Sequence, residues 1–278
     1  MLGLEEFDDV LKLDTYVKNA FKVVLTEIDF NTLEKQVASI TIGWEESFQS
    51  ELTSLPAGKR QAYSTKYANV FSSFYQAIFS PTDALKDIEF LESLFESDRE
   101  QVDLRVETGK EDSIIYVFSK KKYQLTEFMP HLQNLSLVVI DENTYELTIN
   151  SEQIYIYTYY VRSLEEQLNA YENFYEDFCE LLLAVFEKRT EDDILNGLIL
   201  SAGLSKDEIN LFILYRNYYW QIGAPYLPIN KCFLDNASVI KSVRDFFIAK
   251  FNPSNGNQPL VENQLNAHRD QVLKEIET

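Results

Sequence analysis

The side chains that could carry out acid–base, nucleophilic or metal chemistry are few in this 278-residue sequence. It contains two histidines, His131 and His268, and two cysteines, Cys179 and Cys232. A zinc site needs three or four such ligands grouped at short spacings. Neither histidine has a cysteine or a second histidine at such a spacing. The sequence therefore predicts no metal site and no catalytic residue among them.

The acidic run Glu191-Asp192-Asp193 is the remaining candidate for cation binding. A calcium loop places oxygen ligands at alternate positions around a turn glycine, and this run has neither feature. Thr190 precedes the run, and acidic residues behind a threonine are typical of a helix N-terminus, where they complement the helix dipole. We therefore expect a helix capped by Thr190 and ending at Gly203.

Motifs for nucleotide binding and acyl transfer are absent from the sequence. The eight glycines are scattered, and neither G-x-G-x-x-G nor G-x-x-x-x-G-K-[ST] occurs. The G-x-S-x-G turn that presents a nucleophilic serine is missing as well. We therefore predict no catalytic residue and no cofactor-binding residue in this chain.

The stretch "YRNYYWQIGAPYLPIN" (Tyr215 to Asn230) allows three interpretations: an aromatic nucleic-acid platform, a buried core helix with its stop signal, or a piece of a larger machine. The chain carries 25 basic and 45 acidic residues, a net charge of −20, whereas nucleic-acid binders place basic residues over phosphates. We therefore expect no nucleic-acid partner.

The periodicity around this stretch favours a core helix. Residues Ile209 to Gly223 are apolar over most of the helix circumference, which is typical of a helix buried in a bundle. Gly223 and the prolines that follow predict its end. Arg216 would then be a partly buried cation that needs a carboxylate, helix-end carbonyls or an aromatic face.

Targeting signals are not evident either. No run of about 18 apolar residues is present, and the N-terminus lacks a basic region followed by an apolar one. We therefore expect no membrane partner and a cytoplasmic protein. Both cysteines lie in apolar, helical surroundings, so we expect reduced, buried thiols.

The coarse pattern along the chain changes from mixed to helical. Residues 21–28 predict a strand, residues 31–52 and 63–78 two helices, and Ser80-Pro81 the start of a third. Strands follow at 102–107, 113–119, 136–142, 144–149 and 153–161, with a helix over 126–135. With the first strand, the order approaches β-α-β-β-α-β, a ferredoxin-like layout with inserted helices.

The last third of the sequence predicts helices alone. Apolar residues from Leu164 to Val185 step by three and four, which fits one long bundle helix, with a coiled coil as the alternative. Ser205 and Glu208 form a capping box at the start of the next helix. The predicted fold class is therefore α+β: a ferredoxin-like antiparallel module over residues 1–162, with a helical insertion at about 31–79, and a helical region over 163–278.

The order of these motifs resembles the large NAD-specific glutamate dehydrogenases. Near the C-terminus, Tyr215, Arg216, Gln221 and Gly223 are followed by "AKFNP", which ends at Phe251, Asn252 and Pro253. Upstream, "LTEFMPHLQNLSLVVIDE" carries Pro130 and Asn134 at the family's positions, with Ser136 where the family has glycine. Trp44, in "IGWEESFQSEL", matches a family helix that precedes both motifs.

The resemblance falls on the part of the family polypeptide that precedes the dehydrogenase domain. It implies an ACT-like α+β module, a helical region and a parent enzyme that uses NAD to convert L-glutamate to 2-oxoglutarate and ammonia. The partners it implies are the rest of the parent polypeptide, a homo-oligomer and an amino-acid effector. A free-standing effector-binding module and a purely structural helical adaptor remain as alternatives.

Overall fold

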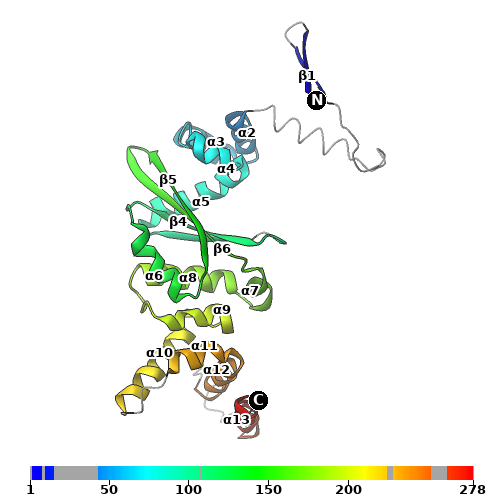
Figure 1. Cartoon of the computed structure of the whole chain (residues 1–278). Coiled ribbons are helices and arrows are strands. Elements are labelled where there is room, and N and C mark those ends of the chain that lie inside the picture. Colours follow the sequence, from blue (N-terminus) through cyan, green and yellow to red (C-terminus); the bar gives the residue numbers. More distant parts are fainter. Residues whose placement is uncertain are drawn as a thin grey trace, which may run out of the picture.

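A four-stranded antiparallel sheet lies at the centre of the molecule, with the strand order β3-β4-β6-β5 (Figure 1). The computed structural model describes residues 2–7, 10–15, 43–106, 108–223, 228–251 and 262–277. The strands of the sheet are β3 (Gln101–Val106), β4 (Asp112–Ser119), β5 (Val139–Ile149) and β6 (Glu152–Arg162). A separate hairpin consists of β1 (Leu2–Phe7) and β2 (Val10–Thr15).

The α+β class and the antiparallel sheet are confirmed. The strand order shows which strand fills the fourth place of the ferredoxin-like sheet. The predicted strand over residues 21–28 lies outside the described residues. The place beside β4 is held by β6, which pairs antiparallel with both β4 and β5. The prediction of separate strands over 136–142 and 144–149 is wrong, because both belong to β5, with a register shift between Val139 and Asp141.

The two inner strands of the sheet are apolar on both faces. In β4, Ile115 and Val117 belong to one hydrophobic core, and Tyr116 and Phe118 to the other. Strand β6 alternates in the same way, because side chains of a strand point to opposite faces in turn. Both faces of the sheet must therefore be covered by helices.

One face is covered by four helices, α2 (Trp44–Leu52), α3 (Ala57–Lys66), α4 (Ser73–Ile78) and α5 (Pro81–Ser97), which lie above the sheet in Figure 1. Helix α5 starts at Ser80-Pro81 as predicted, and the Ser80 side chain forms a capping box with Asp83. The single helix predicted over 63–78 is wrong, because the chain breaks at Asn69, whose φ is 57°, and restarts at Ser72, whose side chain caps α4.

The other face is covered by α6 (Leu125–Asn134), α7 (Glu165–Ala170) and α8 (Phe174–Phe186). Behind them lie the 3-10 helix η2 (Ile194–Gly197) and α9 (Leu198–Ala202). The prediction of one long helix from Leu164 to Val185 is wrong, because Asn173 takes the left-handed conformation with φ 59° and separates α7 from α8. Asparagine tolerates this conformation better than most residues.

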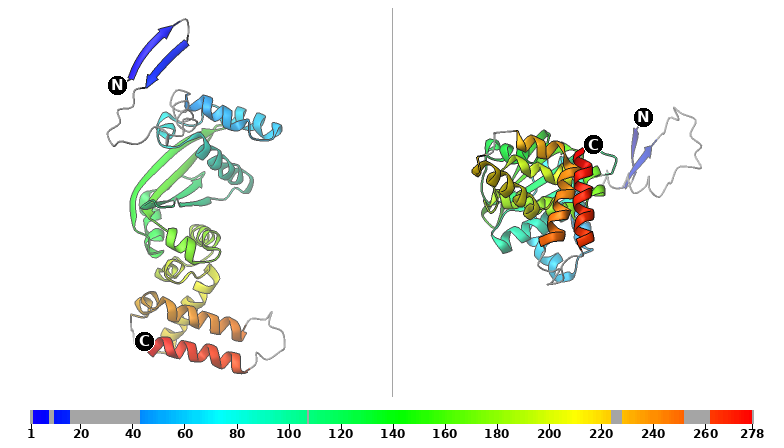
Figure 2. Two further views of the ribbon diagram at one scale, coloured as in Figure 1. Left: turned by 90° about the vertical axis from the view of Figure 1, so that its right-hand side faces the viewer. Right: turned by 90° about the horizontal axis from the view of Figure 1, so that it is seen from below.

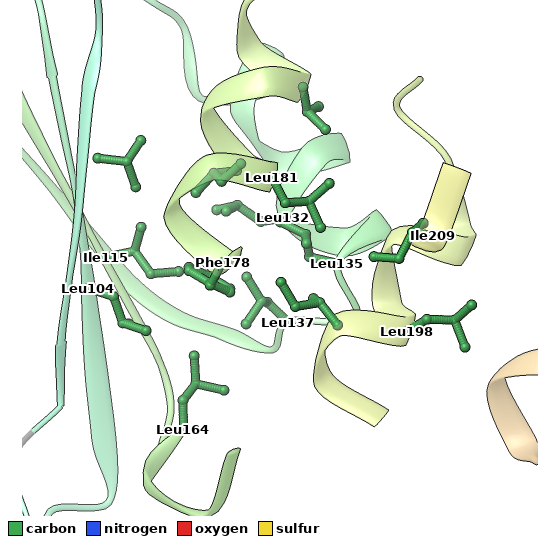
Figure 3. Close-up of a cluster of buried hydrophobic side chains, with 14 of the residues drawn as sticks. Leu104, Ile115, Leu132, Leu135, Leu137, Leu164, Phe178, Leu181, Leu198 and Ile209 are labelled. Carbon is green, nitrogen blue, oxygen red and sulfur yellow. The ribbon is translucent and has the colours of Figure 1, made fainter. Parts of the chain in front are cut away.

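A single hydrophobic core continues from the sheet into the helical region. Figure 3 shows Leu104 and Ile115 of the sheet facing Phe178 and Leu181 of α8, while Leu198 and Ile209 lie further along the same cluster. This core crosses the predicted division at residue 162, which places one side of the sheet and the first helices of the C-terminal region in the same packed unit.

The C-terminal end consists of α10 (Lys206–Gln221), α11 (Ile229–Asp235), α12 (Ala237–Phe251) and α13 (Glu262–Glu277). The capping box of Ser205 and Glu208 is present, and Gly223, with φ 77°, follows the end of α10 as predicted. Helices α12 and α13 run side by side (Figure 2). Among the described residues, no helix is long and apolar enough to cross a membrane.

The prediction that α10 is buried over most of its circumference is wrong. One face, with Ile209, Phe212, Ile213 and Arg216, is buried against the core. Tyr215 and Tyr218 are exposed, and Trp220 is only half-buried. The reason is that η2, α8 and α9 pack against this face of α10, whereas α11 and α12 add only a few contacts, such as Phe212 with Phe233 and Tyr215 with Phe247.

Candidate functional site

A cleft of about 530 Å³ opens beside the edge strand β3, between the N-terminal half of α5 and the hairpin that joins β3 to β4. Its apolar wall includes Ile78, Phe79 and Ile114. The charged lining is balanced, with three acidic and three basic side chains: Asp83, Glu111, Asp112, Lys86, Arg105 and Lys110. Such a lining can pair with a small molecule that carries both an ammonium and a carboxylate group.

The floor of the cleft is a buried ion-pair network centred on Arg105. Its guanidinium donates hydrogen bonds to the carboxylates of Asp87, on α5, and Asp103, on β3. The Nε–Oδ2 distance to Asp103 is 2.8 Å. The guanidinium carbon also lies 3.9 Å from the ring centroid of Tyr116 on β4. Arg105 thus fixes α5 to the edge of the sheet.

Two tyrosines extend this network to both faces of the sheet. Tyr75 on α4 donates a hydrogen bond of 2.5 Å to the second carboxylate oxygen of Asp87. Tyr175 on α8 donates one of 2.8 Å to Asp103. Because β3 is an edge strand, a helix from each face can reach one of the two carboxylates that bind Arg105.

Burial shifts the pKa values of two groups in the network, Asp87 and Tyr75. Complete burial raises the pKa of Asp87 to about 6, although Arg105 and the Tyr75 hydroxyl oppose the shift. Asp87 therefore stays ionised at neutral pH. Burial also raises the pKa of Tyr75, followed by the charge of Asp87, so this phenol keeps its proton and remains a donor. At neutral pH the network therefore holds the Arg105 cation between two carboxylates, with Tyr75 as a neutral donor.

The second polar cluster lies where η2 meets α10. Arg216, only 5% exposed, places Nη1 2.7 Å from Asp193 and 3.2 Å from the side-chain oxygen of Asn230. Its guanidinium also lies 5.0 Å from the ring of Trp220. The expectation that Arg216 needs a carboxylate or an aromatic face is confirmed, because it has both.

The acidic run Glu191 to Asp193 connects three elements. Asp193 caps η2 by accepting a hydrogen bond from the backbone of Leu195, so the prediction of a Thr190 cap is wrong. The Thr190 hydroxyl instead donates to Asn210. Asp192 accepts a hydrogen bond of 2.9 Å from Asn134 and lies 2.7 Å from Nδ1 of His131, both on α6.

The other residues of the family motifs are dispersed. Trp44 begins α2 and donates its indole N–H to the carbonyl of Phe79 at 2.8 Å. Pro130 lies exposed within α6. Tyr215 and Phe251 both line an apolar groove at the C-terminal end, where their rings approach Phe247. Gln221 ends α10, whereas Pro253 lies outside the described residues.

The cysteines differ from their predicted state. Cys179 on α8 is half-buried and Cys232 on α11 is exposed, so burial of both thiols is wrong. Both are free. Burial raises the pKa of Cys179 to about 12, which makes it a poor nucleophile at neutral pH. His268 lies on α13. Within the described parts of the chain, no group of three or more metal-ligating residues was found.

Comparison with known families supports the resemblance seen in the sequence. Three family models of glutamate dehydrogenase match successive stretches: helical motif 2 over residues 52–94, the ACT3 domain over 102–172 and helical motif 3 over 190–253. Together they cover more than half of the chain. The chain belongs to the glutamate dehydrogenase family. The ACT3 match spans the central sheet together with α6 and α7, helical motif 2 spans α3 to most of α5, and helical motif 3 runs from just before η2 to the end of α12.

Two curated relatives have the same family name. The chain is 25% identical to the NAD-specific glutamate dehydrogenase of Mycobacterium tuberculosis over 206 residues, which is 69% of the chain and 12% of the relative. It is 22% identical to the Halomonas elongata protein of that name over 203 residues, 70% of the chain and 12% of the relative. The match therefore spans only about an eighth of the length of each relative.

The Asp87–Arg105 network was not identified from the sequence, although a signal existed. Asp87 stands on the apolar face of α5, next to Ala84, Ile88 and Leu91, where an ionised residue is unusual without a partner. Arg105 alternates with apolar residues in "VDLRVE". Because that alternation is typical of a strand with one solvent face, the sequence signal comes from Asp87 alone, which needs a cationic partner on its buried side of α5.

A double-mutant cycle tests the network. Asp87→Ala should lower the free energy of unfolding by about 3–5 kcal/mol, because Arg105 loses a buried partner. Arg105→Ala should cost a similar amount, and the double variant less than the sum, with a coupling of about 2 kcal/mol. Chemical denaturation at pH 7.5 measures all three. The exposed pair Lys122–Glu146, 2.6 Å apart, serves as the matched control and should show almost no coupling. Additive costs at Asp87 and Arg105 would contradict the network.

Proposed function

We propose that the chain is a non-catalytic, scaffolding and regulatory segment of a large NAD-dependent glutamate dehydrogenase. The parent enzyme would convert L-glutamate, NAD and water to 2-oxoglutarate, ammonia and NADH. The observation that carries this proposal is the succession of helical motif 2, the ACT3 domain and helical motif 3 along one chain. The segment itself contributes fixed charges and packed helices, and we propose that it has no dehydrogenase activity alone.

The size of the relatives supports a scaffolding role. The aligned region makes up 12% of each relative, so most of their length lies outside it. We therefore propose that the partner of this segment is the rest of the parent polypeptide, with its dehydrogenase domain, in a cytoplasmic homo-oligomer. NAD would bind to that domain rather than to the segment.

The cleft beside β3 supports the binding of an amino-acid effector, which is also the activity of the second candidate function, a free-standing module. Its balanced charges can neutralise a carboxylate and an ammonium group at once, and the apolar wall of Ile78 and Ile114 can receive a side chain. The same cleft would serve regulation within the parent enzyme. A purely structural helical adaptor would need no such cleft.

The size of the native polypeptide distinguishes the first two functions. An antibody raised against the segment should detect, in the source cells, a polypeptide several times larger than 32.4 kDa. The immunoprecipitate should form NADH from glutamate and NAD, measured by absorbance, whereas the purified segment should not. A native polypeptide of about 32.4 kDa would support the free-standing module instead. NADH formation by the purified segment would show that it is catalytic.

Calorimetry tests the effector site. We expect at least one of the common amino acids to release or absorb heat on binding at millimolar concentration, where weak effectors bind. Lys86→Ala removes a cation from the cleft and should weaken binding more than about tenfold, the effect of losing about 1.4 kcal/mol. Lys122→Ala, at an exposed lysine that does not line the cleft, should leave binding unchanged. The absence of heat with every amino acid would support a structural role alone.

A further inference from the structure

The outer side of α10 presents an apolar stripe that nothing in the described structure covers. Leu214, Tyr218 and Ile222 follow each other at intervals of four residues and are 63%, 59% and 62% exposed. Residues four apart lie on the same side of a helix, so these three form a continuous ridge. An apolar ridge of this kind on a helix indicates a missing partner rather than a solvated face.

An apolar groove of about 660 Å³ lies directly beside this ridge. It runs between α10, α11, α12 and α13, and its lining includes Leu211, Tyr215, Phe247, Phe251 and Ile276. Tyr215 connects the two features, because it lines the groove and stands one residue from Leu214. The same surface therefore carries an apolar ridge and an apolar groove next to each other.

The distribution of charge identifies which surface another acidic molecule can approach. Residues 206–278 contain eight acidic and eight basic residues, so the net charge of −20 resides in residues 1–205. Two copies that met through their sheets or their α2–α5 ends would bring like charges together, which is unfavourable. Two copies that met through α10 and α12 would place their neutral ends in contact.

We propose that this surface is the contact between two copies of the chain in solution, related by a two-fold axis. Such an interface uses the same patch on both copies, so each patch must be self-complementary. The adjacent ridge and groove meet this requirement, because the ridge of one copy can enter the groove of the other. In this arrangement Leu214, Tyr218 and Ile222 of one copy contact groove residues of the other, such as Leu211, Tyr215 and Phe247. The proposal does not depend on the parent enzyme.

Analytical ultracentrifugation of the 278-residue chain tests the proposal. The mass should rise from 32.4 kDa toward twice that value over roughly 1–100 µM, the range for a micromolar Kd. Added NaCl should strengthen the dimer, because it screens the repulsion between the acidic parts and leaves apolar contacts intact. Leu214→Asp should raise the Kd more than about tenfold, since each dimer would bury two unpaired carboxylates.

The matched control is Ile140→Asp, at a position on the edge strand β5 that is 54% exposed. This variant should dimerise like the parent chain. Circular dichroism melting should show that both variants remain folded, because both positions are exposed. Three results would overturn the proposal: a monomer at every concentration, which would leave the surface to a different segment, a dimer that survives Leu214→Asp, or a dimer lost in Ile140→Asp, which would place the contact at the sheet edge.

Discussion

The arrangement of this molecule depends on two strands that are apolar on both faces. Strands β4 and β6 place large side chains alternately into the two hydrophobic cores, so neither face of the sheet can be left in water. Helices α2–α5 cover one face, and α6–α8 cover the other. The polar network of Arg105 joins the two layers around the edge strand. The cleft beside β3 exists because α5 is held at this edge.

The hydrophobic core on the α6–α8 side of the sheet also explains how the C-terminal helices are attached. Helices α9 and α10 contribute Leu198, Ile209 and Phe212 to the same cluster as the sheet residues. Two consecutive carboxylates add polar contacts, because Asp192 accepts a hydrogen bond from α6 and Asp193 one from Arg216 on α10. The glutamate dehydrogenase motifs that the family models separate are thus packed together in three dimensions. The outer side of α10 lies outside this packed unit, so its apolar side chains Leu214, Tyr218 and Ile222 remain exposed.

The sequence predicted the elements well where local physics determines them, as in the helix start at Ser80, the capping box of Ser205 and the stop at Gly223. It failed at Asn69 and Asn173, because single left-handed residues interrupt a helical period without changing it. It also failed at α10, because the apolar pattern shows that a face will be buried but not whether the same chain buries it. The Asp87–Arg105 pair is non-local, so neither residue alone revealed the cleft.

The central claim is that the sheet and the helices on both faces form one cooperative unit. The two tryptophans test it, because Trp44 reports on α2 and Trp220 on α10. Denaturant unfolding can be followed by fluorescence in Trp44→Phe and in Trp220→Phe, each checked against circular dichroism of the same variant. Both cores share β4 and β6, so within each variant the fluorescence and circular dichroism transitions should coincide. A Trp220 signal that unfolds at a lower denaturant concentration than the rest of the molecule would contradict the claim and favour a separate helical domain after residue 162.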